Sequence, residues 1–118
     1  MPPLTLSCQH LPGAVTVITV AGEVDHTTSD QLDTFIQQAR RQPSDHLVVE
    51  LTEMPFMDSS GLSVLIRAYV LAHQHGGSLR LAAPPPVPAR LLRITGLDAR
   101  LPVHATTADA LAAASKVE

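Results

Sequence analysis

The stretch HLVVELTEMPFMDSSGL, residues 46–62, decides how the chain is expected to fold. It contains the continuous apolar run 47–49, which is typical of a strand covered on both faces, as in a parallel sheet with flanking helices. Its last part, residues 58–61, lies where an apolar segment gives way to a helical pattern. We therefore expect residues 46–51 to form the central strand of a sheet and residues 60–75 to form the helix that follows.

Upstream of this stretch, the sequence indicates two strands and a helix. Residues 4–10 and 14–21 favour antiparallel strands, because a turn at Pro12-Gly13 separates them and the second is rich in Val, Ile and Thr. Residues 29–42 place apolar side chains at the spacing of one helical stripe, and a proline then ends the pattern. The chain is therefore expected to open with a hairpin followed by a helix.

Downstream, strand and helix patterns continue to alternate. Residues 78–82 predict a strand and residues 89–94 a short helix. Residues 101–104 predict a short strand and residues 107–116 an alanine-rich helix. Such alternation implies right-handed crossovers and a mostly parallel sheet. The predicted fold is α/β: a mixed sheet of roughly four to five strands with an antiparallel edge strand and about four helices, in a single domain over residues 1–118.

Composition excludes several classes of protein. Hydrophobic residues make up 45% and charged residues 16% of the chain, as in proteins that fold on their own. The net charge of -3, with two Phe and one Tyr, lacks the electrostatic footprint and the stacking surfaces of nucleic-acid binding. We also expect neither export nor a membrane span. The lone Cys8, in a predicted strand, favours a reduced, packed thiol and a cytoplasmic protein.

Two predicted strand-to-helix loops carry polar residues. One contains Glu23 and Asp25, and the other is the segment 58–61, Asp-Ser-Ser-Gly. Because parallel strands bring such loops to one edge of the sheet, where ligands and partners usually bind, we expect both groups to face the same side. Ordinary helix capping is the alternative role for Asp25 and its threonine neighbours, and also for Asp58 or Ser59.

Gly61 adds an observation that capping does not explain. A glycine in the first turn of a helix costs about 1 kcal/mol of helix stability relative to alanine. Its presence at this position suggests that something approaches the backbone closely. A phosphate or the surface of a partner protein would qualify.

Three segments carry a resemblance to a known family. The segment FMDSSGL at residues 56–62, with GEVD at residues 22–25 upstream, closely resembles the STAS-domain anti-sigma factor antagonists of bacteria. The segment RITGL at residues 93–97 also resembles the end of the family's third helix. The resemblance spans nearly the whole chain, in order and at family-like spacing. The serine motif is highly specific in that setting.

The resemblance implies a phosphorylation switch. In such proteins the serine directly after the aspartate, here Ser59, is phosphorylated by an anti-sigma factor that is also a serine kinase. A PP2C-type phosphatase removes the phosphate. The unphosphorylated form binds the anti-sigma factor and frees its sigma factor. The resemblance also implies that ATP belongs to the partner, that this chain needs no cofactor, and that the free protein is a monomer.

The same resemblance nominates residues that contact the partner. Glu23 and Asp25 match the family's loop and would face a basic patch on the partner. Asp58, Ser60 and Gly61 flank the switch serine and are predicted to join the interface.

The helix at residues 60–75 is apolar on two sides, which adds a further candidate. Its core stripe is expected to include Ile66, whereas Val64 lies on the opposite side, in line with Ser60. Two alternatives follow from this pattern. Either the helix is enclosed in the core, or the Val64 side docks a partner beside the switch serine.

Enzymatic and metal-binding alternatives find little support in the residues. An esterase elbow requires glycine two places before its serine, and Met57 holds that place before Ser59. No histidine lies at a spacing that pairs it with the serine loop. His73 and His75 point to different sides of a helix, so no metal site is expected. A tight intrinsic ATP site is not expected either, because no glycine-rich loop carries a lysine.

A third hypothesis keeps the STAS fold and gives it another role. Some relatives in the family are structural subunits of larger signalling or lipid-transport assemblies. Purification at a large apparent mass with other subunits would favour that role.

Overall fold

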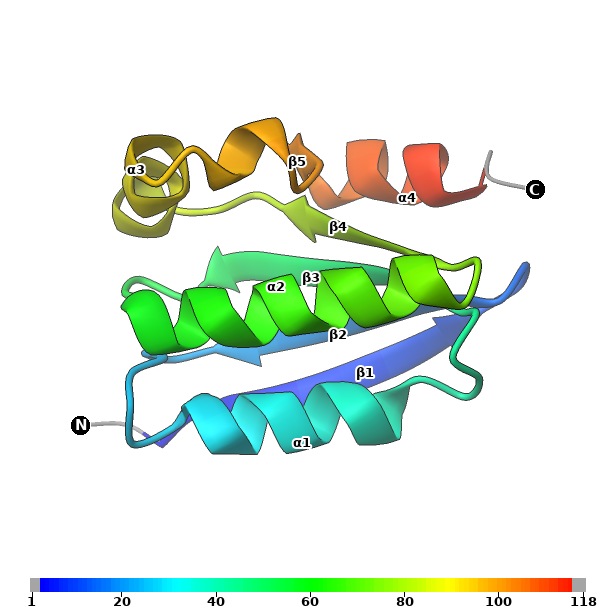
Figure 1. Ribbon diagram of the computed structural model, residues 1–118, viewed down its shortest axis with the longest axis horizontal. Helices are drawn as coiled ribbons and strands as arrows, with labels where there is room; N and C mark the ends of the chain where they lie inside the picture. The colour runs from blue at the N-terminus through cyan, green and yellow to red at the C-terminus, as the bar shows by residue number, and fades with distance from the viewer. Residues whose placement is uncertain (1–2, 116–118) are drawn as a thin grey trace.

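Within residues 3–115, which the computed structural model describes, the chain forms a five-stranded sheet (Figure 1). Neighbouring strands follow the order of the chain: β1 (Thr5–Leu11), β2 (Val15–Ala21), β3 (His46–Glu53), β4 (Ser78–Ala82) and β5 (Val103–His104). The β1–β2 pair is antiparallel, and the other pairs are parallel. The predicted mixed, mostly parallel sheet with an antiparallel edge strand is therefore confirmed.

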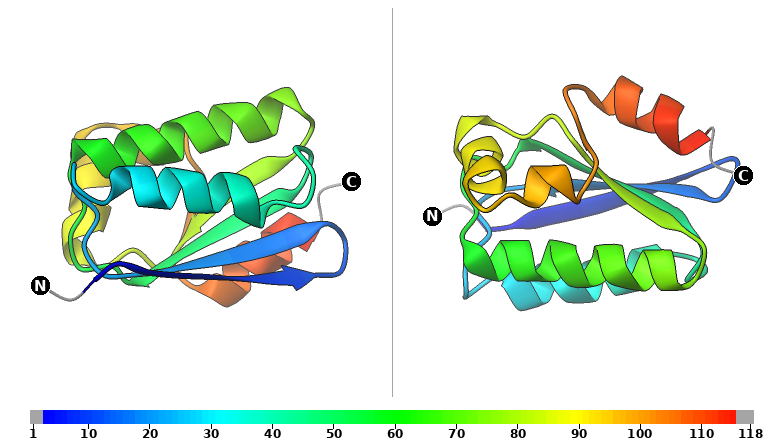
Figure 2. Two further views of the ribbon diagram at one scale, coloured as in Figure 1. Left: turned by 90° about the horizontal axis from the view of Figure 1, so that it is seen from below. Right: turned by 45° about the horizontal axis from the view of Figure 1, so that its top comes forward.

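Helices cover both faces of this sheet. They are α1 (Ser29–Ala39), α2 (Ser59–Gln74), α3 (Pro86–Ile94) and α4 (Thr107–Ser115), with a short 3-10 turn, η1 (Leu97–Ala99). Figure 2 shows α1 and α2 side by side on one face and α4 on the other. The third helix, α3, lies at the end of the molecule where α2 begins. Lys116, the last residue of the predicted C-terminal helix, lies outside the described residues.

The central strand β3 is buried on both faces, as its continuous apolar run predicts. Leu47 and Val49 belong to the main core, to which α1 and α2 contribute. Val48 points the other way and packs with Ala110 and Ala114 of α4. Alternate residues of this run therefore serve two separate hydrophobic clusters, which explains why residues 47–49 are apolar without interruption.

The first helix is shorter than the predicted helix at residues 29–42. After Ala39, Arg40 adopts an extended conformation (φ -70°, ψ 135°). The backbone N–H of Arg41 then donates to the Asp45 carboxylate at 2.8 Å. Because a side chain accepts this amide, the helix ends before it reaches the proline that was expected to stop it.

The third helix begins earlier than the predicted helix at residues 89–94. Pro86 is its first residue, where a missing N–H costs nothing because that group would have no helical partner. The N–H of Ala89 donates to the carbonyl of Pro85 at 2.9 Å, which closes the first turn. The proline-rich segment therefore starts the helix instead of merely preceding it.

Cys8 is exposed, which corrects the prediction of a packed thiol. It lies on β1, an edge strand that pairs with β2 alone. Most side chains of β1 are exposed along its length. A strand pattern by itself therefore says little about burial when the strand lies at the edge of a sheet.

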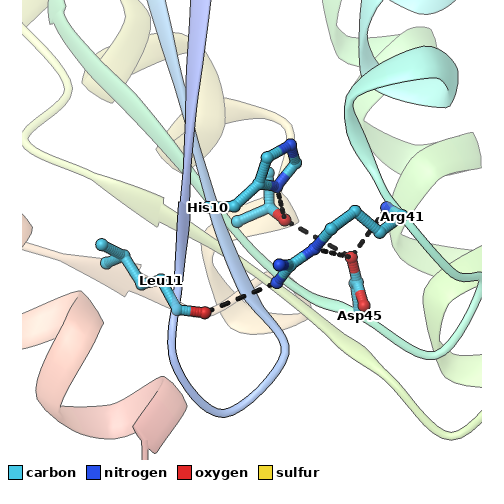
Figure 3. A network of polar contacts seen from close by, with 5 residues as sticks. His10, Leu11, Arg41 and Asp45 are labelled. Atoms are coloured by element: carbon cyan, nitrogen blue, oxygen red, sulfur yellow. Dashed lines mark hydrogen bonds and ion pairs between the residues drawn. The ribbon is translucent and has the colours of Figure 1, made fainter.

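A polar network ties the β1–β2 hairpin to the segment that precedes β3 (Figure 3). The buried Asp45 accepts the Arg41 backbone N–H at 2.8 Å and the Thr16 hydroxyl at 3.4 Å. The Thr16 hydroxyl also lies 3.1 Å from His10 Nδ1. The Arg41 guanidinium donates to the carbonyl of Leu11 at 3.4 Å. One carboxylate thus holds three segments together at the amino ends of β2 and β3.

Replacing Asp45→Ala should lower the free energy of unfolding by about 1–3 kcal/mol, because the buried Thr16 hydroxyl would lose its acceptor. Urea unfolding followed by circular dichroism measures this change. Gln42→Ala, at an exposed position of the same connection, is the control and should change stability by less than about 0.5 kcal/mol. Equal midpoints for the two variants would contradict the role assigned to Asp45.

Candidate functional site

The backbone of Val24 joins the two polar loops. Its N–H donates to the carbonyl of Phe56 at 3.1 Å, and its carbonyl accepts the N–H of Asp58 at 3.1 Å. These bonds form an isolated parallel bridge between Val24 and Met57, and both side chains are buried. The β2–α1 and β3–α2 loops therefore lie side by side, which confirms that their polar residues share one edge of the sheet.

Asp58 caps α2. Its carboxylate accepts the N–H of Ser60 at 2.8 Å, and its carbonyl accepts the N–H of Leu62 at 3.2 Å. Of the two residues considered for capping, Asp58 therefore fills the role, and the Ser59 hydroxyl is not needed for it. Ser59 is exposed as the first residue of the helix, while Asp58 and Ser60 are half-buried. The Ser59 side chain is therefore open to an incoming protein.

Gly61 is buried, and the groups that approach it belong to the chain itself. A Cβ at this position would lie 2.5 Å from Met57 Cγ and 3.0 Å from both Met57 Sδ and Val24 Cγ1. A close approach is therefore present, and Met57 and Val24 of the chain itself make it. Gly61 is buried and lets α2 begin directly against the Val24–Met57 bridge, so a role in packing explains this glycine without a partner.

The side of α2 that carries Val64 is also buried. Val64 is 1% exposed and belongs with Ala68 to the main core, so this side of α2 is buried and Val64 is not a surface contact. The helix is not enclosed on all sides, because Val70 is 44% exposed. Ile66 was expected in the core stripe but is 36% exposed. Leu62 and Leu65 are buried together with Val64 and Ala68, so the buried stripe of α2 runs between the two expected sides and leaves Ile66 at its edge.

Hydrogen bonds from Thr27 fix the carboxylate of Asp25. Asp25 Oδ1 accepts the Thr27 hydroxyl at 2.6 Å and the Thr27 backbone N–H at 2.8 Å. These bonds lower the pKa of Asp25 below its ordinary value of 3.8, because they favour the charged carboxylate. The charged Asp25 carboxylate therefore stabilises the loop. This stabilisation is fully present at pH values above 3.8 and is lost as the pH falls through the lowered pKa. Asp25 therefore carries a negative charge at neutral pH.

Thr28 occupies the N-cap position of α1, but its side chain does not cap the helix. Its hydroxyl instead accepts the N–H of Asp25 at 3.0 Å and donates to the carbonyl of Glu23 at 3.1 Å. The Thr28 side chain therefore closes the loop between Glu23 and Asp25 and, contrary to the capping alternative, does not cap α1. The half-buried Glu23 and Asp25 are held on the same edge as Ser59.

An exposed apolar groove adjoins Ser59, and the sequence analysis missed it. The groove has a volume of about 470 Å³ and lies between the β3–α2 loop and α3. Its lining residues are Phe56, Met57, Asp58, Ser59, Val87, Arg90, Leu91 and Ile94. Phe56 is 40%, Val87 52% and Ile94 68% exposed. Unlike the Val64 side of α2, this surface offers large apolar side chains to a partner.

The spacing of residues in α3 held a signal for this groove. Val87, Leu91 and Ile94 recur at helical spacing and therefore lie on one face of the helix. Leu92 faces the main core from another side. A short helix with a second apolar stripe beside its core residue is the pattern that could have predicted this exposed apolar surface.

Residues 6–110 match the family described as STAS domain. The chain belongs to the STAS domain family. An anti-sigma F factor antagonist of Paenibacillus polymyxa is 35% identical to this STAS domain over 109 residues, which cover 92% of each chain. The crystal structure of an anti-sigma factor antagonist from Mycobacterium paratuberculosis is similar with a TM-score of 0.83 and 32% identity, covering 95% of this chain and 94% of that one.

A second similar structure is that of the Bacillus cell fate determinant SpoIIAA in its phosphorylated form. Its TM-score is 0.67 at 22% identity, and the match covers 92% of this STAS domain and 98% of that chain. At this identity the likeness shows a shared fold. Among residues 3–115 of this STAS domain, no helix is both long and apolar enough to cross a membrane.

Two histidines of this STAS domain bond to partners outside the serine loop. His46 Nδ1 lies 2.8 Å from the Ser78 hydroxyl, inside the sheet. His104 Nε2 lies 3.2 Å from a guanidinium nitrogen of Arg80. These pairs link neighbouring strands and contribute to the scaffold.

Replacing Gly61→Ala should destabilise this STAS domain by about 1–3 kcal/mol, although alanine favours helices, because the new Cβ overlaps the buried Met57 side chain. Ser63→Ala, at an exposed position of the same helix, is the control and should stay within about 0.5 kcal/mol of the original. Urea unfolding gives both values.

The cause is tested by a double-mutant cycle with Met57→Ala. The cost of Gly61→Ala should shrink when the Met57 side chain is truncated, because the two changes share one space. An equal cost in both backgrounds would show that the overlap with Met57 is not the reason.

Proposed function

We propose that this STAS domain is an anti-sigma factor antagonist that is switched by phosphorylation of Ser59. The unphosphorylated form binds an anti-sigma factor in the cytoplasm and thereby releases the sigma factor. The observation that carries the proposal is the exposed Ser59 at the start of α2, directly beside an exposed apolar groove. The similarity to proteins named as anti-sigma factor antagonists supports it.

In this proposal the chain is the substrate of the phosphoryl transfer and not its catalyst. The anti-sigma factor is itself the serine kinase and holds ATP. A bond forms between Ser59 Oγ and the γ-phosphorus as the bond to the β-phosphate oxygen breaks, so ADP leaves and the hydroxyl proton passes to a base of the kinase. A PP2C-type phosphatase reverses the modification with water, which restores the hydroxyl and releases inorganic phosphate.

Phosphorylation of Ser59 should leave the fold intact. The side chain is exposed, so a phosphoryl group displaces no core residue. The group adds about -1.5 to -2 charge, which the positive end of the α2 dipole favours. The capping bond from Ser60 to Asp58 does not use the Ser59 hydroxyl and therefore remains available.

The same phosphoryl group should prevent docking. A dianion at Ser59 would lose its water when a partner covers it, and the neighbouring Asp58 would repel it. Burying such a charge without a partner costs on the order of several kcal/mol. We infer that the apolar groove seats the anti-sigma factor, while the polar contacts to a basic patch on that partner come from Glu23, Asp25, Asp58 and Ser60.

Ser59→Ala should bind the anti-sigma factor constitutively, whereas Ser59→Asp should bind at least about tenfold more weakly because its charge is permanent. Pull-downs from the native host identify the partner, and calorimetry measures the two affinities. Incubation with the kinase and ATP should place phosphate on Ser59, as mass spectrometry reports, and Ser60→Ala should remain a substrate. Phosphate on another residue, together with equal affinities for the two Ser59 variants, would refute the switch.

If the anti-sigma factor docks in the groove, substitutions at two exposed apolar residues should affect its binding differently. Ile94→Ser should weaken binding of the anti-sigma factor by about 5- to 30-fold, because Ile94 lines the groove. Val70→Ser, on the exposed side of α2 and away from this groove, should change the affinity by less than about twofold. Calorimetry with both variants decides the matter. Equal losses would place the partner elsewhere.

A further inference from the structure

Arg90 lies in the groove that adjoins Ser59. It belongs to α3 and lines the groove from that side, whereas Asp58 and Ser59 line it from the facing loop. We propose that Arg90 binds the phosphoryl group of phosphorylated Ser59 across this groove. This inference rests on the proposed function, since it concerns the phosphorylated state of the same serine.

The Arg90 guanidinium is available for this contact. Arg90 is exposed, and the ion pairs among residues 3–115 involve other arginines, Arg41 and Arg67. Asp58 shares the groove with Arg90, but one oxygen of its carboxylate already accepts the N–H of Ser60 at 2.8 Å. A phosphoryl group on Ser59 would therefore be the strongest anion within the groove.

The chemistry of the two groups favours their pairing. A guanidinium presents parallel N–H donors that match two oxygens of a phosphate monoester. Apart from Asp58, the groove offers the guanidinium no other carboxylate, so a phosphoryl group on Ser59 would be its main anionic partner. The arginine side chain is long and flexible, and a groove of about 470 Å³ leaves room for both groups.

The contact gives phosphorylation a second effect on docking. The first effect is the charge added at Ser59. In addition, the Arg90 side chain is drawn across the groove, so that the space for an apolar side chain of the partner is already occupied. The phosphorylated chain therefore covers its own docking seat without a change in backbone structure.

The test uses a chain in which phosphoserine is incorporated at position 59 during translation, so that no kinase is needed. The second pKa of the phosphate is measured by ³¹P NMR titration. A bound guanidinium stabilises the dianion, so Arg90→Gln should raise this pKa by about half a unit. Arg90→Lys, which keeps the charge but loses the fork of donors, should give a smaller rise.

Arg93→Gln is the matched control. Arg93 is exposed on the same helix, and its replacement by glutamine removes the same charge. It does not line the groove. It should shift the phosphate pKa by less than about 0.2 units. Amide NMR spectra of each variant verify the fold, and Arg90→Lys serves as the test if Arg90→Gln does not fold.

The outcomes separate this inference from the proposed function. A phosphate pKa that does not respond to Arg90→Gln, or that responds equally to Arg93→Gln, overturns the contact. The same phosphoserine chain is then tested for binding to the anti-sigma factor. If phosphoserine abolishes binding but its pKa does not respond to Arg90→Gln, only the arginine contact is refuted. If phosphoserine does not weaken binding, the proposed switch is refuted.

Discussion

The backbone of Val24 is the constraint on which the site depends. By donating to Phe56 and accepting from Asp58, it holds two loops from distant parts of the chain in one register. Beside this bridge, the Met57 side chain packs against Gly61. It fills the space that a Cβ at residue 61 would need, so only glycine fits there without overlap. An exposed serine is thereby presented on a buried, hydrogen-bonded platform instead of a loose loop.

Such a platform suits control by charge. The bonds that build it do not use the Ser59 hydroxyl, so a modification there alters the electrostatic character of the surface and leaves the scaffold untouched. The scaffold is secured independently at the other ends of β2 and β3, where Asp45 joins the hairpin to the segment that follows the first helix. The Ser59 hydroxyl therefore takes no part in either set of stabilising hydrogen bonds.

Local sequence patterns predicted this fold where burial leaves little choice, as in the continuous apolar run at residues 47–49. They predicted the end of α1 poorly, because the Asp45 side chain accepts an amide that periodicity assigns to the helix. The pattern of α2 alone did not show that Val64 is buried and Ile66 exposed, because apolar residues lie on two sides of the helix. The position of Ser59 followed from its motif, but the groove beside it requires the placement of α3 relative to the serine loop.

The outward face of α3 bears on how such a protein can diversify. Leu92 anchors this helix in the core, whereas Val87 and Ile94 project from it and contribute little to folding. Substitutions at the two projecting positions can accumulate after gene duplication while the serine and its platform stay the same. Under the proposed function, copies of one switch would thus drift apart in partner choice, so that parallel regulatory circuits in a single cell remain insulated from one another.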